Sequence, residues 1–259
     1  MRMMKKVLGT VTVLALSVSL LAGCGSTAVS PVSSTASTAA ESTTSSVVSE
    51  TTSAAADENA AAAAQLLNDL TGSYQELWPV ILADEYQQTW LDDCTALVGE
   101  ENAEAAFEKL SSMVTGDVYG EDAVEAYANG GGAYFCGFTN SLATLTFDGE
   151  TSTISGTDKD GNVLFSHTYH YIGMEPVHGL YEFESDDADS GEFTYFFLAP
   201  DTSAETYHIE FRYGSDAEAL SQYDAGEYAY WVASGISTDC DQTMIDNCIE
   251  LFCTENLAG

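Results

Sequence analysis

Positive charge is scarce in this chain. It has 6 Lys and Arg against 41 Asp and Glu, which gives a net charge of −35 at neutral pH. Three of the cations lie near the N-terminus, so only Lys109, Lys159 and Arg212 remain for the rest of the chain. A surface this rich in carboxylates repels nucleic acid and anionic lipid head groups. We therefore expect no nucleic-acid partner, and the simplest interpretation is the solubilising surface of a secreted protein.

Signature motifs of catalysis are also absent. The sequence has no HExxH, no phosphate-binding loop ending in Gly-Lys and no Gly-x-Ser-x-Gly turn. These patterns position a zinc-bound water, a nucleotide or a nucleophilic serine. The paired CxxC spacing that a cysteine-ligated metal cluster needs is missing as well. The absences predict that the protein is not an enzyme.

Apolar runs long enough to cross a bilayer as a helix are missing too. The one extended apolar stretch, residues 7–22, is short for a span, follows a basic start and ends in Leu21-Ala22-Gly23-Cys24. This order is typical of a lipoprotein signal peptide. We predict a leader over residues 1–23 and a lipid on Cys24, which would anchor the chain on the extracytoplasmic face of the cell membrane.

The segment after Cys24 contains little besides Ser, Thr, Ala and Val. Such a composition cannot bury enough apolar surface to offset the entropy lost on ordering, so we interpret residues 24–65 as the lipidated cysteine and a disordered stalk. Asp57–Leu70 contains an N-cap candidate and an alanine run, which predict a helix. This helix would lead into one folded domain at residues 66–259.

Two apolar periodicities organise the folded domain. Helical spacing recurs in three stripes, which are Trp90, Leu91, Cys94, Leu97 and Val98, then Ala106, Phe107, Leu110, Met113 and Val114, and finally Met244, Ile245, Cys248, Ile249 and Phe252. The strand patterns between them cover residues 133–139, 142–147, 150–156, 163–172, 180–184, 192–199 and 207–213. Asp160-Gly161 is typical of a hairpin turn. The order predicts a mainly β (α+β) fold, an antiparallel β-barrel or half-barrel with flanking helices at both ends.

Five cysteines remain once Cys24 carries a lipid, in a compartment that permits disulfides. They are Cys94, Cys136, Cys240, Cys248 and Cys253. Cys248 and Cys253 lie at i and i+5 on a predicted helix and point to different faces, so they should not bridge each other. We expect structural roles for these residues, with Cys240 as the best candidate for a disulfide to one partner.

Four features of the second half follow the order of a known family. They are the Asp160-Gly161 hairpin, Gly-Leu-Tyr-Glu-Phe-Glu at 179–184, Phe-Phe-Leu-Ala-Pro at 196–200 and a His-Ile strand that runs to Gly214. From about Leu66 to the C-terminus, the chain thereby resembles the ZinT/YodA family of zinc-binding proteins. The resemblance implies a lipocalin-like barrel. It also implies zinc binding or zinc delivery beside a metal ABC importer or its binding protein.

In that family three histidines hold the zinc, and the matching positions here are Phe196, Thr206 and His208. Neither Phe nor Thr offers the imidazole lone pair that the metal needs, so only His208 is retained. Other donors would have to complete the site. The candidate zinc ligands are His208, Glu210, His178 and His170.

Alternation along the last predicted strand leaves a second function open. The residues of its apolar face are Tyr207, Ile209, Phe211 and Tyr213, and those of its polar face are Thr206, His208, Glu210 and Arg212. The simplest account of the polar face is a Glu210–Arg212 pair beside a hydrogen-bonded histidine. Alternatively, Thr206 and Arg212 could bind an anionic group with His208. The protein would then be a degenerate barrel that binds a small anionic ligand or a protein partner without metal.

Overall fold

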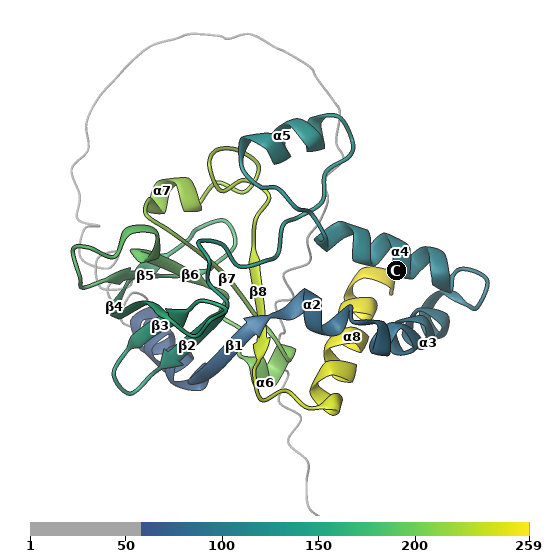
Figure 1. Cartoon of the computed structure of the whole chain (residues 1–259), viewed down its shortest axis with the longest axis horizontal. Coiled ribbons are helices and arrows are strands. Elements are labelled where there is room, and N and C mark those ends of the chain that lie inside the picture. Colours follow the sequence, from purple (N-terminus) through teal and green to yellow (C-terminus); the bar gives the residue numbers. More distant parts are fainter. Residues whose placement is uncertain (1–57, 259) are drawn as a thin grey trace, which may run out of the picture. The chain divides into compact units, whose positions relative to one another are not determined.

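Eight antiparallel strands form a closed barrel in this computed structural model, which describes residues 58–258 (Figure 1). The strands are β1 (Gly72–Glu76), β2 (Thr144–Asp148), β3 (Thr153–Thr157), β4 (Val163–Met174), β5 (Tyr181–Ser185), β6 (Tyr195–Leu198), β7 (Ile209–Gly214) and β8 (Ala233–Ser237). Each strand pairs with its neighbours in the chain, and β1 pairs with β8. The predicted antiparallel barrel with flanking helices is therefore confirmed, in its closed form. Cys24 and the predicted leader lie outside the described residues.

The strands that close the barrel, β1 and β8, carry no alternating pattern that predicts a strand. β8 reads Ala-Ser-Gly-Ile-Ser, and its first four residues are buried whichever face they occupy. Small side chains fit there because β8 is covered on both sides, by the barrel core within and by helices outside. Burial on both faces removes the alternation that reveals a strand in sequence.

The strand expected at residues 133–139 is wrong. Within the described structure this segment makes isolated bridges only, from Phe135 to Thr115 and to Trp231. The Phe135 N–H donates to the carbonyl of Tyr230 at 2.9 Å, and its carbonyl accepts from Val232 at 3.1 Å. The segment is thus held against the stretch that leads into β8, outside the barrel ladder.

Aromatic rings fill the barrel. The fully buried rings of its core include Phe147, Phe183, Phe196, Phe211 and Tyr213. Phe196 and Tyr213 lie 5.4 Å apart between ring centroids, and the Tyr213 hydroxyl donates to the carbonyl of Thr139 at 3.0 Å. Side chains therefore occupy the interior, as they do in small barrels.

Residues 58–69 are helical, as expected for the helix at Asp57–Leu70. The disordered stalk expected to reach residue 65 is therefore wrong for residues 58–65, which belong to this helix. Ala63, Leu66 and Leu67 of this helix belong to the barrel core. A Cβ on Gly149, in the turn between β2 and β3, would collide with the backbone of Asn68. Glycine at this position therefore lets the helix lie directly against the hairpin.

Four helices form a second core beside the barrel (Figure 1). They are α2 (Leu77–Ile81), α3 (Gln87–Val98), α4 (Ala103–Val114) and α8 (Gln242–Leu257), here called the helical layer. Trp90, Leu110 and Ile249 lie in the buried stripes of α3, α4 and α8, which confirms the three predicted helices. Ile236 of β8 belongs to this second core, so the helical layer packs on the outside of the barrel.

The remaining helices of the described chain are short. They are η1 (Asp84–Tyr86), α5 (Glu121–Ala128), η2 (Gly191–Phe193), α6 (Ser203–Thr206) and α7 (Ala217–Leu220). Across residues 58–258, helices with the length and apolarity to cross a bilayer are not found. Tyr207 follows the end of α6 with a left-handed φ of 67°, and β7 begins only at Ile209. The expected apolar face is therefore wrong at Tyr207, which packs against the helical layer and not inside the barrel.

Candidate functional site

His208 lies between α6 and β7, where the barrel meets α8. Its Nδ1 is 2.7 Å from the carbonyl oxygen of Thr206 and 3.8 Å from Cys248 Sγ. Its Nε2 is 3.8 Å from Glu210 Oε1. Since a carbonyl only accepts, the short contact places a hydrogen on Nδ1. Nε2 is then the nitrogen that remains for Glu210 or for a ligand.

Acidic groups gather around this imidazole. Burial opposes a charge on His208, but Cys248 and Glu210 beside the ring hold its pKa well above the usual value. Burial and neighbouring carboxylates raise the pKa of Asp201, and His208 opposes that shift. Burial also raises the pKa of Glu255, with His208 opposing it and Glu210 and Asp201 adding to it. These five residues are here called the His208 cluster: Cys248 and Glu210 lie beside the imidazole, and Asp201 and Glu255 interact with it electrostatically.

The zinc positions implied by the ZinT/YodA resemblance do not form a ligand set. Phe196 is fully buried in the barrel core. Thr206 ends α6, and its hydroxyl lies 2.8 Å from the carbonyl oxygen of His208. Only His208 could offer a nitrogen to a metal, and one imidazole does not make a zinc site of three or four ligands. The residues present therefore do not fit the three-histidine centre.

Arg212 is completely buried on the polar side of β7. Its terminal nitrogens donate to the backbone carbonyls of Leu220, Gln222 and Tyr228, and its guanidinium lies 4.2 Å from the ring centroid of Tyr223. Among residues 58–258, Arg212 forms no salt bridge, so the expected Glu210–Arg212 pair is not formed. The guanidinium fastens the 220–228 segment to the barrel, which removes it from the polar face that was expected to attract an anion.

The other two candidate histidines lie in separate settings. His170 on β4 is half exposed, and its Nδ1 is 2.7 Å from Asp186 Oδ1. His178 packs on Tyr223, with 3.8 Å between ring centroids, beside the buried carboxylate of Glu175. Neither makes a recorded contact with His208. Throughout the described chain, no group of three or more His, Cys, Asp and Glu side chains is arranged to hold a metal ion.

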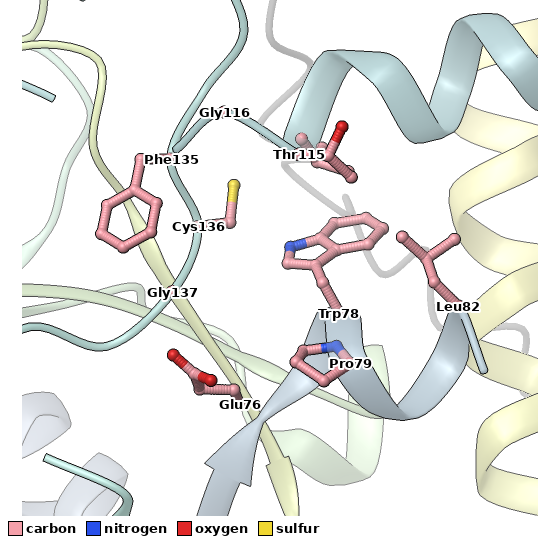
Figure 2. Close-up of a pocket in the computed structure, with 10 residues that line it drawn as sticks. Glu76, Trp78, Pro79, Leu82, Thr115, Gly116, Phe135, Cys136 and Gly137 are labelled. Atoms are coloured by element: carbon pink, nitrogen blue, oxygen red, sulfur yellow. The ribbon is translucent and has the colours of Figure 1, made fainter. Parts of the chain in front are cut away.

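A pocket of about 330 Å³ opens where the barrel meets the helical layer (Figure 2). Three segments form its walls: the end of β1 with α2, the end of α4, and residues 135–137. The side chains that matter for its chemistry are Glu76, Trp78, Leu82, Val114, Phe135 and Cys136. The pocket is therefore mostly apolar, with one carboxylate, one thiol and the hydroxyl of Thr115.

Trp78 supplies the unusual group of this pocket. Its side chain is buried, with 9% exposure, and its Nε1 makes no hydrogen bond of standard geometry in the described structure, with the Cys136 thiol as the polar group beside it. A buried N–H without a partner costs about 1–3 kcal/mol. Figure 2 shows the indole nitrogen on the side of the ring that faces Cys136 and Phe135. A ligand atom that accepts this hydrogen bond would remove the penalty.

Glu76 and Cys136 add a carboxylate and a thiol to the wall of the pocket. Oε1 of Glu76 accepts the N–H of Phe138 at 2.6 Å, which fixes the carboxylate at the pocket wall. Burial, followed by the nearby Glu210, raises the pKa of the Cys136 thiol to about 12 although Trp78 and Ser234 oppose the shift. Cys136 is therefore a neutral, weakly polar wall, and Glu76 provides the negative charge.

Sequence reasoning missed Trp78 and Glu76 as site residues. Their only local signal is Glu-Leu-Trp-Pro at 76–79, where an acidic residue ends one element and a tryptophan lies in the first turn of the next. The other walls come from residues 114–116 and 135–137, which no local pattern joins to this segment. Only the closed barrel brings the three segments together.

Comparison with known proteins gives distant structural similarity. No family model matches the chain, and no curated protein does. The Zn(II)-bound ZinT-like domain of AdcA from Streptococcus pneumoniae is 16% identical with a TM-score of 0.45, over 71% of this chain and 89% of that one. Zn(II)-bound AdcA from the same organism is 15% identical with a TM-score of 0.42, over 70% of this chain and 34% of that one. Similarity at this level transfers no ligand set, so the site is judged on its own residues.

Proposed function

We propose that this protein is a membrane-tethered binding module that takes a small organic ligand into the pocket beside Trp78. The observation that carries the proposal is the buried indole N–H, which lacks a partner within residues 58–258 and borders the pocket. Ligand pockets are typically apolar, about 300–1,000 Å³ in volume, and carry a few polar groups. At about 330 Å³ this pocket is near the lower limit, so the ligand is small.

The lining defines the chemistry of the ligand. Trp78, Leu82 and Phe135 suit an aromatic ring or a short apolar body, and Trp78 Nε1 suits a hydrogen-bond acceptor. Glu76 favours an amine. A cation also gains from the faces of aromatic rings and from the net charge of −35. The proposed ligand class is therefore a small amine with an apolar body and one acceptor atom.

Tyramine is a suitable probe, because it carries an ammonium group, a ring and a phenolic oxygen. The matched anion is 3-(4-hydroxyphenyl)propionate, and phenethylamine is the matched amine without the acceptor. We expect tyramine to bind with a Kd of about 1 mM or tighter in titration calorimetry, since small ligands reach modest affinities. The anion should bind at least tenfold more weakly. Equal binding of both, or no tyramine binding at 10 mM (on the order of ten times the expected Kd), would exclude this ligand class.

Two substitutions test the assigned groups. Trp78→Phe keeps an aromatic ring and removes the N–H, so it should weaken tyramine binding about fivefold and leave phenethylamine unchanged. Glu76→Gln should reduce the preference for amine over anion. Glu184→Gln removes a carboxylate outside the pocket and serves as the control. A loss of tyramine affinity in the control alone would show that the pocket is misassigned.

The tether is supported by the leader pattern that ends at Cys24. A lipid at that residue would hold the module outside the cell membrane, where it could meet external ligands. Fractionation of cells tests this step, because Cys24→Ala should move the protein from the membrane fraction to the soluble fraction. Retention of Cys24→Ala in the membrane would argue against the lipid anchor.

A divalent cation bound by the His208 cluster is the second candidate. The observation that favours it is the Glu210 carboxylate 3.8 Å from His208 Nε2; within residues 58–258 no third side chain is arranged with them to hold a metal ion, so further ligands would have to move in. This function would make the chain a lipid-anchored metal-binding or metal-delivery protein, with an ABC importer as its partner. The raised pKa of His208 works against it, because a proton competes with the metal for Nε2.

Zinc loading separates the two candidates. The protein is incubated with Zn²⁺, freed of unbound metal and analysed for zinc. Stoichiometric zinc that disappears in His208→Ala and persists in His170→Ala would support the metal function. Zinc well below one equivalent in the unmodified protein would exclude the metal function. It would leave the outcome of the tyramine experiment unaffected.

A further inference from the structure

Two buried sulfur atoms lie in contact within the helical layer. Cys94 Sγ on α3 and Cys253 Sγ on α8 are 3.9 Å apart, and both residues are fully buried. The helices that carry them pack against each other. A disulfide needs a sulfur separation of about 2.05 Å, so rotation of the two side chains with a small adjustment of the helices would bring them to bonding distance.

We propose that Cys94 and Cys253 form a disulfide that fastens α8, the last helix of the chain, to α3. The inference is independent of any ligand in the pocket. The bond would join residues 159 positions apart, and cross-links that close long loops restrict the unfolded chain most strongly. It would therefore stabilise the helical layer against the undocking of α8.

The other cysteines occupy different settings. Cys136 lines the pocket, and Cys248 contacts His208. Cys240 lies in the turn after β8 and is partly exposed, and all five cysteines of the described chain are reduced in the structure. Contact between sulfur atoms points to Cys94 and Cys253, and the pairing expected for Cys240 stays a prediction.

Formation of the bond is a two-electron oxidation that a disulfide reagent completes. One cysteine thiolate attacks the disulfide of an oxidised dithiol protein or of oxidised glutathione, forms a mixed disulfide and releases one reagent thiol. The second cysteine thiolate attacks the mixed disulfide, forms the Cys94–Cys253 bond and releases the other reagent thiol. Two protein thiols are oxidised, one reagent disulfide is reduced to two thiols, and the balance is complete.

Burial determines when this exchange takes place. Both sulfurs are inaccessible once α8 has docked, and burial raises the pKa of each thiol, which lowers the reactive thiolate population. The reagent therefore reaches them while α8 is undocked, during folding or transient opening. After docking, the same burial protects the bond from external reductants.

Peptide mapping tests the proposal on the full chain. Reduced, urea-unfolded protein is refolded with oxidised and reduced glutathione, free thiols are blocked, and the product is digested without reductant. Trypsin cuts after Lys109 and Arg212, which places Cys94 and Cys253 in different peptides. A second digestion, with a protease that cuts after glutamate, completes the separation. Cleavage after Glu250 separates Cys253 from Cys248, and cleavage after Glu50 separates Cys94 from Cys24.

We expect a peptide linked through Cys94 and Cys253, and a melting temperature that falls by roughly 5–10 °C when the bond is reduced. Cys94→Ala should lose the linked peptide and the sensitivity of the melting temperature to reductant. Cys240→Ala, the matched control, should retain both. Blocked thiols at both Cys94 and Cys253 after oxidative refolding, or Cys94 linked to another cysteine, would overturn the proposal. The mapping of the unmodified chain decides the question even if Cys94→Ala fails to fold.

Discussion

The barrel interior and its junction with the helical layer are both buried, yet they differ in how their polar groups are hydrogen-bonded and in how completely side chains fill them. Inside the barrel, rings pack on rings, and the Tyr213 hydroxyl has its partner in Thr139. At the junction, Trp78 Nε1 has no partner in the described chain, a pocket of about 330 Å³ remains, and His208 has acidic neighbours. Buried polar groups normally have partners, and Arg212 Nε on β7 also lacks one, so it is the pocket beside the indole N–H that sets the junction apart.

The same difference separates the positions that the ZinT/YodA resemblance implies for zinc. Phe196, one of these positions, belongs to the barrel interior, where the ring is part of the packed core. Polar groups that could meet a ligand lie outside the barrel wall, at Trp78 and His208. The barrel is therefore a packed scaffold, and the polar groups available to a ligand lie at its junction with the helical layer.

The largest expected effect is in the barrel. Phe196→Ala should lower the free energy of unfolding by about 3–5 kcal/mol, because a fully buried ring leaves a cavity that its neighbours cannot fill. Leu82, in the pocket wall, borders space that is already empty. Leu82→Ala should therefore lower the free energy of unfolding by only about 1 kcal/mol. Urea unfolding measures both. Equal losses would remove the contrast between a filled and an unfilled region.

A smaller loss is expected where the barrel holds its covering loop. Arg212→Ala leaves the buried carbonyls of Leu220 and Tyr228 without their donor and should lower the free energy of unfolding by about 3 kcal/mol. Limited proteolysis should then cut within residues 220–228 before the rest of the domain. Lys109→Ala, at an exposed position, is the control and should change stability by less than about 0.5 kcal/mol. An Arg212→Ala protein as stable as the control would mean that the guanidinium does not hold the loop.

The smallest effect concerns pH at the pocket wall. Because burial raises the pKa of Cys136 to about 12, the folded thiol keeps its proton at a pH where the unfolded thiol has lost it. Its contribution to stability is therefore full below about pH 8.5, the ordinary thiol pKa, and is lost as the pH rises through the folded value. Alkylation at pH 9 should be about a thousandfold slower in the folded protein than in urea. Comparable rates in both states would show that the pocket does not shield this thiol.

The sequence predicts the barrel through residues that face either core or solvent. Strand β4 shows alternation and α8 shows a helical stripe, because each has one buried face, whereas β7 alternates in polarity although both of its faces are buried. Closure was not predictable, since β1 and β8 lack that contrast. The site was harder still, because Glu76, Val114 and Cys136 lie on segments that meet only in the folded chain. The interpretation of His208 as a ligand stays a prediction, and its contact with Cys248 of α8 depends on tertiary structure that the sequence does not reveal.

The pairing of β1 with β8 sets the order in which this domain can form. Tyr74 and Glu76 find their partners in Ser237 and Gly235, at the other end of the folded chain. Contacts so distant in sequence form slowly, because the entropy of closing a long loop is lost before the contacts can stabilise the fold. A nascent chain that lacks β8 therefore cannot seal its barrel, and without α8 it cannot complete the helical layer. The domain should therefore stay open until β8 and α8 are available, and then fold as one unit.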